Sequence, residues 1–135
     1  MGRIKNAKHG PEYKIQAELI DFLEKRGWLV ERMIGNAYQQ GIPDLYIHHP
    51  QHDYRWIDVK RPDGQYTFTK AQKTKWPLWD AFGVGIWILV GADQSEYDKL
   101  FAPPNWKSYW KDSWGPIGQQ LDIDKLLEGL DEEEA

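Results

Sequence analysis

The segment 41–62 constrains the fold of this chain more than any other. It reads GIPDLYIHHPQHDYRWIDVKRP. An apolar run from Leu45 to His49 and a second run ending at Val59 are separated by the turn residues Pro50 and Asp53. This pattern predicts two antiparallel strands joined by a tight turn.

The end of the second predicted strand carries charged residues on one face. Asp58 and Lys60 are two residues apart, so their side chains project from the same side. The hairpin could bring Asp44, which begins the first strand, alongside Asp58. Ile57 and Val59 alternate onto the other face, which suggests that the strand packs on a core beneath the site. Two carboxylates and one lysine are therefore expected to converge.

Such a trio suits the hydrolysis of a phosphodiester. That reaction needs a hard cation to neutralise the non-bridging oxygens and to acidify a water, and Mg²⁺ is typically held by one or two carboxylates while it keeps several waters. Asp44 and Asp58 are the candidate ligands for Mg²⁺ or Mn²⁺. Lys60 is placed to orient the metal-bound water and to stabilise the developing charge.

At these residues the sequence resembles the PD-(D/E)xK nuclease superfamily. Pro43 and Asp44 match its PD, and Asp58, Val59 and Lys60 match its second motif. Within the superfamily the likeness is strongest to VRR-NUC domains, especially the small stand-alone ones of phages, and it spans roughly residues 10 to 92. An acidic residue opening the first helix and a Thr-Lys-Ala-Gln helix start are further signals in the same order.

The resemblance implies an α/β fold with a restriction-endonuclease-like core, in which a mixed central sheet is flanked by helices. It implies a metal-dependent DNA endonuclease that acts on branched DNA, such as a four-way (Holliday) junction, as a homodimer. Asp44, Asp58 and the Val59 carbonyl would ligate the metal. Asp58 stands where the family more often has glutamate, a change of one methylene that the motif permits.

The first helix is predicted from Pro11 to Arg26. Its apolar stripe is centred near Glu12, whereas Glu18 lies about 120° away on the flank, so Glu12 is the preferred acidic residue of the site. The alternative is a first-turn acid that interacts only with the helix dipole. Gln16, one turn on from Glu12, either orients the metal shell or is a half-exposed helix glutamine.

Positive charge follows the Asp-x-Lys strand. Thr69 is the predicted N-cap of a helix that extends to Phe82 and that Pro77 should kink or interrupt. The resemblance implies that Gln72 of this helix faces the active site. The candidate contacts to the DNA backbone are Arg61, Lys70, Lys73 and Lys75. The alternative is that these residues form a solvated helix face.

Two more strands are predicted, at Trp28–Ile34 and at Gly85–Gly91. The second is the most apolar run of the chain and reads as a central strand buried on both faces. The predicted order is a helix, three antiparallel strands, a helix and a fourth strand parallel to a neighbour, with the active site at one edge of the sheet.

An aromatic segment with interleaved lysines follows the last strand. Its aromatic residues fall at helical spacing: Trp106, Tyr109, Trp110 and Trp114. A cap packed over the core is the favoured reading, and base stacking or a dimer interface are the alternatives. Three histidines lack zinc-site spacing and are expected to be turn residues: His48, His49 and His52.

The composition fits one domain of 135 residues with a 41% hydrophobic fraction and no cysteine. We expect a basic N-terminal arm at 1–10, the nuclease domain at 11–120, and a short helix with an acidic tail at 121–135. The acidic tail accounts for the net charge of -4, and the first 120 residues carry a net +2. No membrane segment or oxidising compartment is indicated, so we expect a cytoplasmic protein of a bacterial host or a phage-infected cell.

Other functions remain compatible with the residues. One is a nucleic-acid-binding module without catalysis, although no position of the motif is missing. Others are a nuclease acting on linear duplex DNA or on RNA, and a small structural phage protein whose aromatic segment is an assembly surface.

Overall fold

The computed structural model describes residues 11–33, 40–115 and 117. Their helices and strands follow the predicted order. They are helix α2 (Pro11–Glu24), strands β1 (Leu29–Arg32), β2 (Leu45–His49) and β3 (Asp53–Val59), helix α3 (Lys70–Ala81), strand β4 (Ile86–Leu89) and helix α4 (Gln94–Asp98). Three 3₁₀ turns follow: η1 (Lys99–Phe101), η2 (Trp106–Tyr109) and η3 (Asp112–Trp114).

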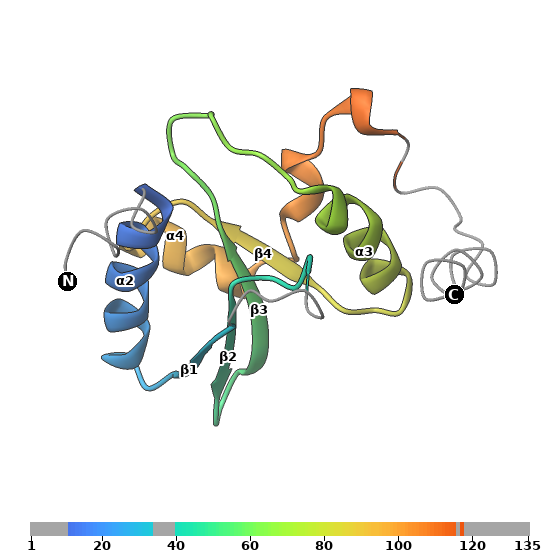
Figure 1. Ribbon diagram of the computed structural model, residues 1–135. Helices are drawn as coiled ribbons and strands as arrows, with labels where there is room; N and C mark the ends of the chain where they lie inside the picture. Colours follow the sequence, from blue (N-terminus) through green and yellow to red (C-terminus); the bar gives the residue numbers. More distant parts are fainter. Residues whose placement is uncertain (1–10, 34–39, 116, 118–135) are drawn as a thin grey trace.

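The strands of the described residues form one mixed sheet in the order β1-β2-β3-β4. β2 is antiparallel to both β1 and β3, and β4 is parallel to β3. Figure 1 shows α2 and α4 on one side of the sheet and α3 on the other. The predicted α/β architecture with a mixed sheet and flanking helices is therefore confirmed.

The two sides of the sheet bury different side chains. The side of α2 holds an aliphatic core, made mainly of Leu19, Leu23, Leu45, Ile47, Ile57, Val59, Leu89 and Leu100. The side of α3 holds an aromatic core, made of Phe68, Trp76, Ile86, Ile88 and Trp106, with Trp56, Tyr66, Trp79, Tyr109, Trp110 and Trp114 packed against it. Alternation along β3 separates them, because Ile57 and Val59 face α2 whereas Trp56 faces α3.

Strand β4 lies at an edge of the sheet and not at its centre, which corrects the prediction. It is nevertheless buried, because the C-terminal segment covers its outer side. The Ile88 N–H donates to Asn105 Oδ1 at 2.6 Å, and Asn105 Nδ2 donates to the Ile88 carbonyl at 2.9 Å. One side-chain amide thus takes the place of a neighbouring strand at this residue.

Helix α3 continues through Pro77, so the predicted interruption does not occur. Trp76 and Trp79, on either side of the proline, pack against Phe68 and Trp56 and hold this part of the helix on the sheet. The aromatic segment is also not an α-helix as its spacing suggested. It forms the 3₁₀ turns η2 and η3, and its rings pack on the aromatic core, as predicted for a cap.

Two predictions concern residues outside the described part of the chain: the arm at 1–10, and the helix and tail at 121–135. Among the helices that are described, none is long and apolar enough to span a membrane.

Candidate active site

The β2–β3 hairpin places the two aspartates side by side. Leu45 pairs with Ile57, so the next pair in register is Asp44 and Asp58. The Asp44 N–H donates to Asp58 Oδ1 at 3.3 Å, and the Val59 N–H donates to Asp44 Oδ2 at 2.8 Å. The site lies at the ends of two inner strands, because this hairpin forms the middle of the sheet.

Lys60 is buried beside Asp58, with only 4% of its surface exposed. Its Nζ lies 3.0 Å from Asp58 Oδ2 and donates to Gln72 Oε1 at 3.1 Å and to the Thr67 carbonyl at 2.6 Å. The rings of Phe68 and Trp76 lie close to the same ammonium, at 4.7 and 5.6 Å from their centroids. Three oxygen acceptors and two aromatic faces therefore replace the water that burial removes.

Gln72 reaches the site because of the way α3 begins. Thr69 and Gln72 form a capping box, in which the Gln72 N–H donates to Thr69 Oγ1 and the Thr69 N–H donates to Gln72 Oε1. The amide oxygen of Gln72 also accepts from Lys60, and its Nε2 lies 3.5 Å from Asp58 Oδ1. The cap that starts the helix therefore also fixes the glutamine that holds the lysine.

The loop before Asp44 is held against the same helix. The Trp76 indole donates to the Gly41 carbonyl at 2.7 Å. A Cβ at Gly41 would lie 2.8 Å from backbone atoms of Ala71, and Gly41 has φ +87°. Only glycine fits this contact without displacing the start of α3.

Burial and mutual repulsion make the carboxylate charges of this site costly. Burial, followed by the neighbouring Asp58, raises the pKa of Asp44 to about 8. Burial also raises the pKa of Asp58, although the Lys60 ammonium opposes the shift. A bound cation would relieve both effects.

The donor set suits a hard cation that keeps most of its waters. Among the described residues, no three or more His, Cys, Asp or Glu side chains are grouped so that they could hold a metal. Asp44 and Asp58 provide two adjacent carboxylates, and each oxygen that accepts one hydrogen bond retains a second lone pair. Mg²⁺ is commonly held by one or two carboxylates, so these residues fit it better than they fit zinc.

The first helix brings Glu12 toward this cluster. Glu12 is half-buried in the first turn of α2, and Glu18 is exposed. Burial raises the pKa of Glu12, the Lys60 charge lowers it and the Asp58 charge raises it, so the carboxylate is within electrostatic reach of the site. Gln16 is half-buried one turn further along. The geometry favours Glu12 over Glu18, and the roles of both stay predictions.

Three of the predicted DNA-contacting cations lie in the first turns of α3, and Arg61 follows the end of β3. Arg61 pairs with Asp63 at 2.6 Å. Lys70 is exposed and Lys75 is half-buried. The Lys73 ammonium lies 4.6 Å from the centroid of the Trp114 ring. Within the described residues these three lysines make no ion pair with a carboxylate.

The histidines lie away from this cluster, at the hairpin turn. His49 packs against Trp28 and His52, and its Nδ1 accepts from the Gln51 N–H at 3.0 Å. These contacts fit the expected role as turn residues.

Sequence reasoning missed the residues that enclose Lys60: Thr67, Phe68 and Trp76. Phe68 directly precedes the N-cap of α3, and this position beside a predicted site was the available signal. It also missed the buried Glu96, which accepts from the Val90 N–H at 2.8 Å and pairs with Lys99 at 2.6 Å. Glu96 thereby satisfies the backbone just after β4.

No family model matches the sequence, and a search of curated proteins gave no match. A solved structure described as a VRR_NUC domain superposes on this chain with a TM-score of 0.55 and 19% sequence identity. The superposition covers 69% of this chain and 96% of that structure. This chain has the VRR-NUC fold. The predicted resemblance is thus confirmed for the fold, and nearly a third of the chain lies outside the superposed VRR-NUC part.

Proposed function

We propose that this chain is a Mg²⁺- or Mn²⁺-dependent endonuclease that hydrolyses phosphodiester bonds in DNA. The VRR-NUC fold supports a nuclease-type domain. The single observation that carries the proposal is the buried Lys60 ammonium, 3.0 Å from Asp58 and next to the Asp44–Asp58 pair. Burying a lysine and two acids costs folding free energy, and such groups gather where chemistry needs them.

In this proposal Asp44, Asp58 and the Val59 carbonyl hold the metal, and Glu12 assists directly or through a water. The bound cation supplies neutralisation of the non-bridging phosphate oxygens and acidification of a water. Lys60 positions the attacking water and stabilises the charge that develops on the phosphate. Gln72 keeps the lysine in place through its amide oxygen.

The substrate and the assembly are part of the same proposal. The family resemblance implies branched DNA, such as a four-way junction, and a homodimer. Candidate contacts to the phosphate backbone on either side of the cut are Arg61, Lys70, Lys73 and Lys75. The three lysines lie in the first turns of α3, on the same helix as Gln72, and Arg61 directly follows Lys60, which supports this assignment.

Cleavage of a labelled four-way junction and of its matched linear duplex, in Mg²⁺ and in Mn²⁺, tests the proposal. We expect the wild type to cut the junction faster than the duplex. Lys60→Met and Asp58→Asn should bind the junction but cut it at least about 10²-fold more slowly, because each removes a group that acts on the transition state. Lys25→Met is the matched control, since Lys25 is exposed and pairs with Asp21 on α2.

The same assay separates the two glutamates of the first helix. Glu12→Gln should slow cleavage, and Glu18→Gln should not. A wild type that binds DNA but cuts neither substrate in either metal contradicts the catalytic proposal and favours a binding module. Faster cutting of the matched linear duplex would contradict only the branched-DNA part, and faster cutting of RNA would contradict DNA as the substrate. Sedimentation of the free protein tests the homodimer.

A further inference from the structure

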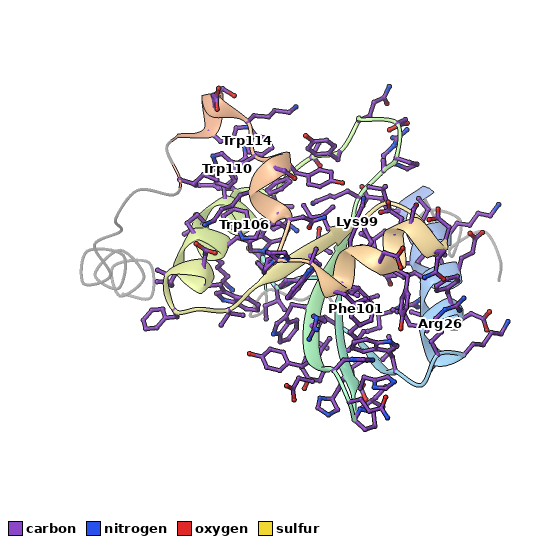
Figure 2. All side chains as sticks on the ribbon, turned by 180° about the vertical axis from the view of Figure 1, so that it is seen from behind. Arg26, Lys99, Phe101, Trp106, Trp110 and Trp114 are labelled. Atoms are coloured by element: carbon purple, nitrogen blue, oxygen red, sulfur yellow. The ribbon has the colours of Figure 1, made fainter. Side chains whose placement is uncertain are left out.

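A group of lysines and aromatic rings lies beside the candidate active site, on the C-terminal segment, the start of α3 and the loop before that helix. We name it the Trp114 platform, and it consists of Tyr66, Lys73, Lys111 and Trp114. The Lys73 and Lys111 ammoniums lie 4.6 and 5.6 Å from the Trp114 ring centroid, and Lys111 lies 5.5 Å from that of Tyr66. Figure 2 shows Trp106, Trp110 and Trp114 following one another along this segment.

Within the described residues, the two lysines of the platform form no ion pair with an acid. Four other described lysines pair with a carboxylate: Lys25, Lys60, Lys99 and Lys107. Lys73 and Lys111 rest against ring faces instead. A ring face holds an exposed ammonium only weakly, by about 0.5–1 kcal/mol, so a phosphate can draw it away.

The platform lies close to the proposed catalytic lysine. The Phe68 ring centroid is 4.7 Å from Lys60 Nζ and 4.8 Å from the Trp114 ring centroid. The Trp114 ring is therefore no farther from Lys60 than the sum of these distances, which corresponds to about three nucleotide rises of 3.4 Å along one strand. A DNA strand held at Lys60 can reach the platform.

Packing alone accounts for only part of this arrangement. Trp106 is 1% exposed and is explained by the aromatic core, whereas Trp110 and Trp114 are half-buried and both pack on Phe68. Lys111 is exposed. Packing of a hydrophobic cap does not require that two lysines, Lys73 and Lys111, lie against the Trp114 ring.

We propose that the Trp114 platform binds an unpaired stretch of the DNA strand next to the scissile phosphate. Lys73 and Lys111 move from the ring faces to phosphates, and a base stacks on the Trp114 or Tyr66 face that they leave. Aromatic faces within a cationic groove are the general means of binding single strands. This inference rests on the proposed nuclease function and adds a substrate feature to it.

Binding of a labelled duplex with a short unpaired tail, compared with the same duplex with blunt ends, tests the inference. Fluorescence anisotropy in Ca²⁺ instead of Mg²⁺, at several salt concentrations, gives the affinity and its salt dependence. Lys111→Ala should weaken binding of the tailed duplex and reduce the salt slope by about 0.7–0.9, as expected for one lost phosphate contact. Trp114→Leu should weaken tailed-duplex binding about fivefold or more and change blunt-duplex binding little.

Lys107→Ala is the matched control, because Lys107 belongs to the same segment but pairs with Asp80 at 2.8 Å. Lys73→Ala and Lys111→Ala change no ring packing, so they carry the test if Trp114→Leu does not fold. The inference is overturned if Lys111→Ala and Lys73→Ala bind the tailed duplex like Lys107→Ala, or if Trp114→Leu weakens both duplexes equally. A wild type that neither binds nor cuts DNA contradicts the proposed function. A wild type that cuts, with Lys111→Ala and Trp114→Leu unaffected, contradicts only this inference.

Discussion

The aliphatic and aromatic cores lie on opposite sides of one sheet, and the aromatic core adjoins the buried Lys60 ammonium. Phe68 and Trp76 lie against the Lys60 ammonium, whereas α2 covers its side of the sheet with leucines such as Leu19 and Leu23. An aliphatic side chain does not compensate a buried cation for the water that it loses, whereas the face of an aromatic ring attracts the cation. The comparison indicates that one side of the sheet mainly stabilises the fold and the other also supports the site.

Asp44→Asn should lower the cleavage rate strongly without lowering the stability of the fold. The amide keeps an oxygen to accept from the Val59 N–H but cannot supply a negative charge to a metal. Cleavage should fall by about 10²–10³-fold. Stability at pH 8 should not fall, because the variant no longer places a second charge beside Asp58. Urea unfolding and single-turnover cleavage of the same preparation measure both effects, and a variant that unfolds in proportion to its lost activity contradicts the expectation.

Leu23→Ala should lower the stability of the fold without lowering the cleavage rate of the folded protein. Leu23 is fully buried in the aliphatic core, and its truncation leaves a cavity. The free energy of unfolding should fall by about 2–5 kcal/mol. The cleavage rate per folded molecule should stay that of the wild type, as measured at a temperature where the variant is still folded. Leu23→Met, which nearly conserves volume, is the control and should cost less than about 1.5 kcal/mol.

The pH dependence of stability should reveal the cost of the acidic site. The pKa of Asp44 is raised in the folded protein to about 8, so between its unfolded value and pH 8 the folded state binds more protons than the unfolded state. Stability in EDTA should therefore fall as pH rises from 5 to 8, by at most about 1.4 kcal/mol per pH unit for one group.

Mg²⁺ should oppose this loss of stability most strongly at pH 8, where it competes with fewer protons. Asp44→Asn is the control, and its stability should depend less on pH. Equal slopes for wild type and variant in EDTA would argue against the raised pKa.

Phe68→Leu should give the smallest effect. It removes the ring nearest to the Lys60 ammonium but leaves an apolar side chain in the aromatic core. We expect the cleavage rate to fall by about three- to thirtyfold with little change in substrate affinity, the range of one desolvated cation–π contact. Phe68→Tyr keeps the ring and should restore most of the rate. A similar loss in both variants would assign the effect to packing and not to the ring.

Much of this fold could be predicted because its signals are local. Alternating residues and two turn residues identify the β2–β3 hairpin, and its pairing alone brings Asp44 to Asp58. The start of α3 could also be predicted from local sequence, since Thr69 and Gln72 have the spacing of a capping box. The place of Glu12 followed from the apolar stripe of its helix.

The rest depends on contacts between distant parts of the chain. The sequence of β4 reads as a central strand because it is apolar. Its edge position depends on the C-terminal segment, in which Asn105, seventeen residues beyond Ile88, pairs with the strand backbone. The spacing of Trp106, Trp110 and Trp114 suits an α-helix, but packing on Phe68 and Trp76 determines the 3₁₀ turns instead. The rings around Lys60 come from loop and helix residues that carry no motif.

The amide of Asn105 also has a consequence for how this protein avoids aggregation. An apolar edge strand invites pairing with a strand of another molecule. The outward N–H and carbonyl of Ile88 are already hydrogen-bonded to the Asn105 side chain. Only a side chain that accepts with one atom and donates with another can make both bonds. Aspartate and leucine cannot do both, so a single substitution at position 105 would reopen the β4 edge to intermolecular strand addition without touching the candidate active site.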